Sequence, residues 1–168
     1  FSFARHETFH IRDGWLFKCL NAISSNPHAL HIADAHHELG VGKNMLQAMK
    51  YWVEASGLVE IQPGNKNVPT SSTITELGNL ILKNDPYFED IASTWLVHIG
   101  ICSNKNLATL WYWMFNKFHL REFNEQRVTE GIQCKFFNKP AYTTTIPAQL
   151  IKKFNCPLVT IYTVSYTH

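Results

Sequence analysis

His6, Glu7 and His10 form an H-E-x-x-H pattern near the start of the 168-residue chain. On a helix this spacing places two imidazoles on one face, where they can bind Zn²⁺ while the glutamate acts as general base on the metal-bound water. The surrounding sequence argues against a zinc peptidase, because Asp13-Gly14 would interrupt a helix soon after His10 and no third-ligand signature follows. We therefore predict no metal site here and interpret the segment as irregular chain packed by its aromatic side chains.

A second group of polar residues points to nucleic acid. Residues 43–56 have helical periodicity, and the side chains predicted to be buried on one face are those of Met45, Met49, Trp52 and Val53. The opposite, outward face carries amide and ammonium groups that can contact adenine, guanine or phosphate. With one lysine from a polar loop at 63–67, the predicted DNA-binding residues are Lys43, Asn44, Gln47, Lys50 and Lys66. A solvated helix face and a polar loop are the alternative interpretation.

The elements that would position these residues follow a recognisable order. Helical patterns at 14–24, 32–39 and 43–56 are separated by a glycine turn at 40–42. Strands at 58–62 and 72–74 and a helix capped by Thr75 come next. This is the order of a winged helix-turn-helix. We therefore predict a mainly α fold in which residues 1–84 form a winged helix-turn-helix unit with a small β-hairpin wing.

A helical region is predicted for residues 85–168, with helices near 91–101, 107–118 and 121–138 and no clear pattern in the tail from about 140. The aromatic cluster Trp111-Tyr112-Trp113 is expected to lie in the core, and so is Trp95. His36 and His37 are expected on the surface, because adjacent helical side chains diverge by about 100° and rarely share one metal.

Composition restricts the class of protein only broadly. Hydrophobic residues make up 45% of the chain and its net charge is +2, which fits a globular protein and permits nucleic-acid binding without requiring it. The four cysteines form no C-x-x-C pair, which indicates reduced thiols. Neither a signal peptide nor a membrane-spanning run is found. We expect a cytoplasmic protein without a membrane partner.

Several segments together resemble the bacterial domain of unknown function 4007 family over roughly residues 1–118. They are His6-Glu7-Thr8-Phe9 with Arg12 and Gly14-Trp15-Leu16, Leu39-Gly40-Val41-Gly42-Lys43-Asn44-Met45, Tyr51-Trp52, Gly57-Leu58, Thr75-Glu76-Leu77-Gly78, Asp85-Pro86-Tyr87, Glu89-Asp90, Trp95-Leu96 with His98, and Trp111-Tyr112-Trp113. In the family the position of His10 is apolar or proline, so the resemblance does not imply His10 as a ligand. From about residue 140 the chain follows the family pattern poorly.

The resemblance implies a role in bacterial DNA phosphorothioation or a related phage-defence system. The partners it implies are double-stranded DNA and the sulfurtransferase-like and ATPase proteins of the same gene cluster. We therefore predict a DNA-binding winged-helix protein of such a system, with no cofactor.

Two other functions stay open. One branch of the family is associated with DNA nicking, for which the candidate catalytic residues are His6, Glu7, His10 and Arg12, with a divalent metal. Glu7 and Arg12 could instead pair and pin the N-terminal segment to the fold. The second alternative is a winged-helix interaction module without DNA affinity.

Overall fold

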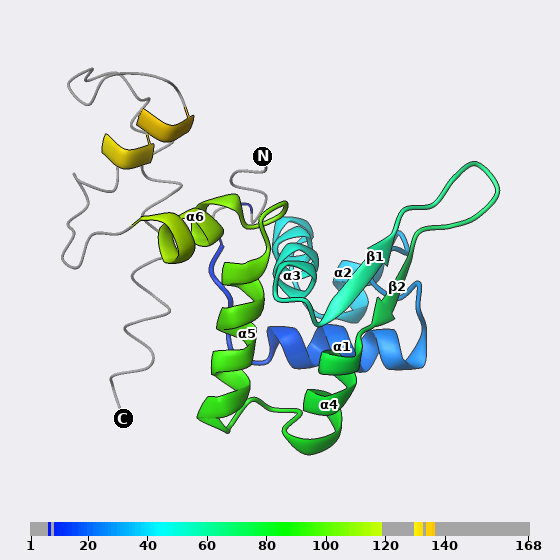
Figure 1. The fold of residues 1–168 in the computed structure, drawn as a ribbon. Coiled ribbons are helices and arrows are strands. Elements are labelled where there is room, and N and C mark those ends of the chain that lie inside the picture. The colour runs from blue at the N-terminus through cyan, green and yellow to red at the C-terminus, as the bar shows by residue number, and fades with distance from the viewer. Residues whose placement is uncertain (1–6, 8, 119–129, 133, 137–168) are drawn as a thin grey trace. The chain divides into compact units, whose positions relative to one another are not determined.

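The computed structural model describes residue 7 and residues 9–118, 130–132 and 134–136. The chain divides into two compact units, residues 1–115 and 116–168. The described part of the first unit is mainly helical with one small antiparallel sheet (Figure 1). Its elements are α1 (Trp15–Ser25), α2 (Ala35–Glu38), α3 (Lys43–Ala55), β1 (Val59–Gln62), β2 (Ser71–Ile74), α4 (Glu76–Asn84), α5 (Ile91–Ser103) and α6 (Thr109–Lys117), whose last two residues belong to the second unit. In the second unit, the described residues 130–132 and 134–136 are helical.

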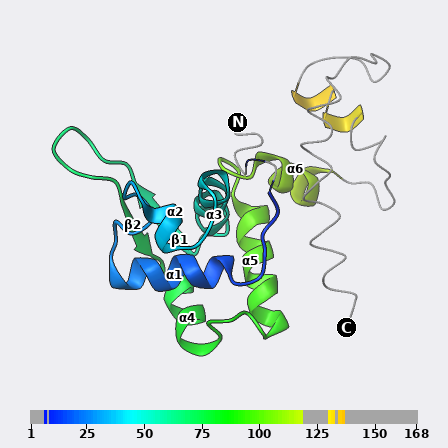
Figure 2. The ribbon, with the colours of Figure 1, turned by 180° about the vertical axis from the view of Figure 1, so that it is seen from behind.

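Helix α1 begins after Gly14, whose φ of 75° is a left-handed conformation that glycine adopts without a Cβ penalty. The side chains that α1 buries recur at helical spacing, as predicted: Trp15, Leu16, Cys19, Leu20 and Ile23. This face packs against α3, α4 and β2. Figures 1 and 2 show α1 passing alongside these elements, with the hairpin projecting from one side of the unit.

Helix α3 and the hairpin follow the predicted order closely. Gly57, at φ 75°, ends the helix, and the chain turns directly into β1. Strand β1 pairs with β2 in a register that places Val59 opposite Ile74 and Gln62 opposite Ser71. The loop between the strands, residues 63–70, extends away from the helices (Figure 1). This element order is compatible with a winged helix.

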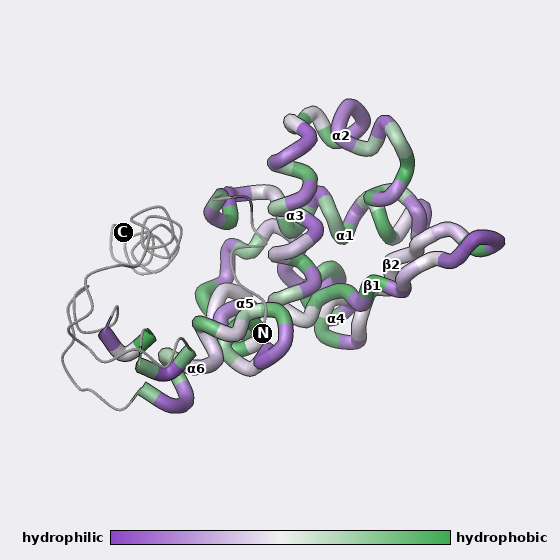
Figure 3. Tube along the Cα trace, turned by 90° about the horizontal axis from the view of Figure 1, so that it is seen from above, coloured by the Kyte–Doolittle hydropathy of each residue, from purple (hydrophilic) through white to green (hydrophobic). Residues whose placement is uncertain are grey.

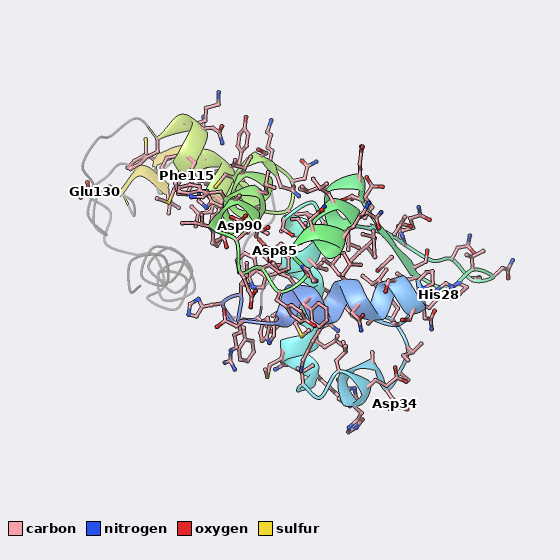
Figure 4. All side chains as sticks on the ribbon, turned by 90° about the horizontal axis from the view of Figure 1, so that it is seen from below. His28, Asp34, Asp85, Asp90, Phe115 and Glu130 are labelled. Atoms are coloured by element: carbon pink, nitrogen blue, oxygen red, sulfur yellow. The ribbon has the colours of Figure 1, made fainter. Side chains whose placement is uncertain are left out.

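Helices α4 and α5 begin with side-chain caps. The Thr75 hydroxyl accepts a hydrogen bond from the Gly78 amide, and the Asp90 carboxylate accepts one from Ala92. The Asp85 carboxylate accepts the amides of Glu89 and Asp90, which orders the turn between the two helices (Figure 4). Both helices lie within the first unit, which continues to residue 115.

Two predicted elements differ from the structure. The helix expected at 32–39 is reduced to α2, because the preceding residues form turns whose backbone and side chains bond to β2. The helix expected at 121–138 lies partly outside the described residues, and so does the tail from 140. Among the helices that the structure describes, none has the length and apolar composition required to cross a bilayer.

Candidate nucleic-acid interface

The first turns of α3 present three of the predicted DNA-binding residues to solvent. Lys43, Asn44 and Gln47 are all exposed. The opposite side of the helix is fixed in the core by Leu46, Met49, Trp52 and Val53, and Met45 is only half-buried. Because Gly42 contributes no side-chain cap, the amide groups at this helix end are not covered by a capping side chain. The N-terminal end of α3 therefore offers amide donors, two side-chain amides and one ammonium group to a ligand.

Lys50 does not share this exposed position. It is half-buried, and burial lowers its pKa, while the neighbouring Cys19 thiol acts in the opposite direction. Burial in turn raises the pKa of Cys19 to about 12, so this thiol is neutral at pH 7. Lys50 is thus less exposed than Lys43 and Gln47, because α1 and the segment before α2 pack beside this part of the helix face.

Lys66 lies at the exposed tip of the β1–β2 loop. The loop is shaped by Asn65, whose side-chain oxygen accepts the amides of Asn67 and Val68. The hydroxyl of Thr70 accepts a further bond from the Gly64 amide. Figure 3 shows the tip mainly in hydrophilic colours. Asn65 thus orders the loop, and the Lys66 ammonium group is presented at its tip.

Two histidines anchor the hairpin to the helices. The His28 Nδ1 atom lies 2.9 Å from the Thr70 carbonyl oxygen, and the His31 Nε2 atom lies 2.8 Å from the Ser72 hydroxyl. The Ser72 amide also donates to the Pro27 carbonyl at 2.8 Å. Figure 4 shows His28 beside the hairpin. Burial lowers the pKa of His31, and the positive charges of Lys50 and His28 lower it further, so neutral imidazole is favoured at this anchor.

These anchors were not predicted. The sequence shows only that His28 and His31 stand three residues apart in a segment rich in turn residues. This pattern does not specify that their partners, Thr70 and Ser72, lie 42 and 41 positions later.

The N-terminal cluster is not helical where the structure describes it. Residues 9–12 form no helix, so His10 lacks the helical setting that the zinc-peptidase pattern requires. Burial lowers the pKa of His10, and the charge of Arg12 adds to this effect. His6 lies outside the described residues. Glu7 is exposed, with a left-handed φ of 49°.

Arg12 braces this segment through aromatic rings. Its guanidinium carbon lies 5.7 Å from the Phe9 ring centroid and 5.6 Å from that of Trp15, within the range of cation–π attraction. The buried Trp52 indole donates a 2.9 Å hydrogen bond to the Phe9 carbonyl. Within the described part of the chain, Glu7 and Arg12 form no ion pair, so the bracing does not depend on Glu7.

Comparison with known sequences and structures identifies the family. The model of a protein family of unknown function, DUF4007, matches residues 3–167. This chain belongs to the DUF4007 family. The match includes the tail after residue 140, which the sequence resemblance had left out. No curated protein matches.

Two solved structures resemble the DUF4007 chain. One is a crystal structure of SspB, with 34% identity and a TM-score of 0.71 over 92% of this chain and 48% of that one. The other is a magnesium ion-bound SspB crystal structure, with 34% identity and a TM-score of 0.70 over 92% of this chain and 47% of that one. The chain therefore spans about half the length of the SspB chains that it matches.

The magnesium-bound relative raises the question of a metal site in this DUF4007 chain. Among the described residues, no three His, Cys, Asp or Glu side chains gather as a group that could hold a metal ion. His36 and His37 have ring centroids 4.1 Å apart, but His36 is buried, contrary to its predicted surface position.

Two of the three aromatic residues predicted for the core in α6 are buried, whereas Tyr112 is half-buried and the neighbouring Phe115 is exposed. Trp111 and Trp113 are buried, and the Trp111 ring meets Trp52 edge-on at 5.6 Å between centroids. Trp95 is different, since 53% of its surface is exposed and its prediction as a core residue is wrong.

Proposed function

We propose that this chain is a DNA-binding winged-helix protein of a bacterial DNA phosphorothioation system. The observation that carries the proposal is the exposed N-terminal end of α3, with Lys43, Asn44 and Gln47, on the same unit as an anchored hairpin tipped by Lys66. The system is suggested by the family and by the likeness to SspB, a phosphorothioation-system protein. The sulfurtransferase-like and ATPase proteins expected from the family are the protein partners of this proposal.

The chemistry of the exposed α3 residues suits a DNA duplex. A recognition helix enters the major groove with its N-terminal residues toward the base edges. Asn44 and Gln47 can each make bidentate contacts to adenine, and Lys43 can reach guanine or a phosphate. The positive end of the helix dipole at Lys43 adds attraction for phosphate.

The hairpin would contribute a contact outside the major groove. A loop held at its base by His28, His31 and Ser72 loses little further freedom when it binds, so a Lys66–phosphate contact there costs less conformational entropy than a mobile arm would. Phosphate contacts of this kind fix register and orientation without reading sequence.

Fluorescence anisotropy with a labelled duplex of about 20 base pairs at low salt tests the proposal. The wild-type chain should bind, and a Lys43→Ala/Lys66→Ala variant should bind at least tenfold more weakly. The matched control is Lys83→Ala/Lys105→Ala, which removes the same charge from two other exposed positions. If the wild type does not bind, the DNA-binding assignment fails and an interaction module is favoured. If both variants lose affinity equally, the assignment of the contacts to Lys43 and Lys66 fails.

A second candidate function is DNA nicking, favoured by the exposure of Glu7 and Arg12 within five residues of each other. A carboxylate and a guanidinium group can serve as proton acceptor and phosphate ligand. Supercoiled plasmid incubated with Mg²⁺ would be relaxed by a nickase, and Glu7→Gln should abolish this relaxation while leaving duplex affinity unchanged. Intact plasmid with the wild-type chain would rule out nicking under these conditions.

A further inference from the structure

Helix α5 has an apolar face that nothing in the described part of the chain covers. Its sequence from Ile91 to Ser103 contains no Asp, Glu, Lys or Arg. One side is buried in the unit through Ser93, Val97 and Ile101. A helix that is apolar on all sides is normally enclosed, and an exposed apolar stripe marks an interaction surface.

The exposed stripe consists of large side chains at regular spacing. Ile91 is 63% exposed, Trp95 53% and Ile99 55%, and Leu96 beside them is 37% exposed. Positions 91, 95 and 99 lie on one i, i+4 ridge of the helix. We refer to Ile91, Trp95, Leu96 and Ile99 as the α5 stripe.

The α5 stripe is complementary to itself. Its two isoleucines stand four residues before and four residues after the central tryptophan. If two such helices pair in antiparallel orientation about Trp95, Ile91 of one copy meets Ile99 of the other, and the two indoles meet on the axis. A two-fold interface requires this kind of symmetry, and the absence of charged side chains on α5 removes the like-charge repulsion that self-pairing would bring.

We propose that the α5 stripe binds the same stripe of a second copy of this chain, in antiparallel orientation with Trp95 on the two-fold axis. The exposed parts of the four side chains amount to roughly 450 Å² per copy, so pairing would remove roughly 900 Å² from water, which is the range of small, reversible interfaces. A central tryptophan is the residue type that most often dominates such an interface. The dimer should therefore dissociate at micromolar concentrations, and its formation requires no DNA.

Sedimentation equilibrium between about 5 and 500 μM tests self-association. The mass should rise from 19.3 kDa toward twice that value with concentration. Trp95→Glu should remain monomeric at every concentration. Val68→Glu, which places the same charge on a side chain that is 56% exposed in the hairpin loop, should behave like the wild type. A monomeric wild type at 500 μM, or a dimer that persists in Trp95→Glu, would overturn the proposal.

Disulfide trapping tests the orientation. In a Cys134→Ser/Cys156→Ser background that keeps Trp95, Ile91→Cys/Ile99→Cys should form a covalent dimer with copper phenanthroline, because antiparallel pairing brings residue 91 of one copy against residue 99 of the other. Ile91→Cys alone should not, since antiparallel pairing separates the two copies of residue 91 by about 12 Å along the helix. Efficient trapping of Ile91→Cys alone would contradict the antiparallel register.

Discussion

The salt dependence of DNA binding tests which lysines contact phosphate, and on this point the structure and the sequence pattern differ most. The pattern assigned Lys43 and Lys50 to one outward face, whereas the structure exposes Lys43 and Lys66 and half-buries Lys50 beside Cys19 and His31. The half-buried Lys50 ammonium group has less access to a phosphate than the exposed ammonium groups of Lys43 and Lys66. Lys43 and Lys66 should therefore account for phosphate neutralisation, and Lys50 should not.

The expected magnitudes follow from counterion release. Each lost phosphate contact reduces the slope of log K against log salt by about 0.9, so the Lys43→Ala/Lys66→Ala variant should lose about 1.8. Extrapolated from 1 M to 0.1 M salt, each contact corresponds to about an eightfold change in affinity, or about 1.2 kcal/mol, and the pair to about sixtyfold.

The assay is anisotropy with one duplex at five salt concentrations between about 50 and 250 mM. Lys50→Met is the matched comparison, because methionine keeps most of the buried side-chain volume and removes only the charge. Its slope should match the wild type. If Lys50→Met loses about 0.9 and the double variant loses nothing, Lys50 contacts DNA and the assignment from burial is wrong.

Three further predictions concern stability. Gly100→Ala should destabilise the fold by about 1–3 kcal/mol in urea unfolding, because its Cβ would overlap the Ser56 carbonyl at the end of α3. Gly42→Ala is the control and should cost less than about 1 kcal/mol, because its Cβ would meet only a Met45 side-chain atom. Equal losses of stability in the two variants would contradict the close packing of α5 on α3. Trp52→Phe should cost about 1–3 kcal/mol, because the Phe9 carbonyl loses its indole donor, and unchanged stability would show that this bond does not hold the N-terminal segment. Burial lowers the pKa of His31 and His98 below the unfolded value of about 6.5, so the unfolded chain binds more protons and stability should fall as the pH drops below about 6.5. The melting temperature of the wild type should therefore decrease from pH 7.5 to 5.5, and that of His31→Gln/His98→Gln should decrease less. A wild-type melting temperature that does not change with pH would contradict the burial of both rings.

The sequence alone determined the types and order of most elements. Apolar side chains at helical spacing specified α1 and α3, because only one face of each can be buried. Gly57 and Thr75 marked a helix end and a helix start through local backbone chemistry, which needs no distant partner. The helical periodicity of α3 also predicted correctly that Lys43, Asn44 and Gln47 are exposed, because they lie opposite its buried face.

The tertiary structure decided which of these faces other elements cover. Lys50 has nearly the same angular position on α3 as Lys43, but it lies two turns further along, where α1 and the segment before α2 pack. Trp95 was expected in the core from its residue type, yet α5 buries its other side. The bonds from His28 and His31 to the hairpin join residues 41 or 42 positions apart. Helical periodicity fixes the direction of a side chain relative to its own helix, but its neighbours depend on contacts between distant segments, and these contacts form only when the chain folds.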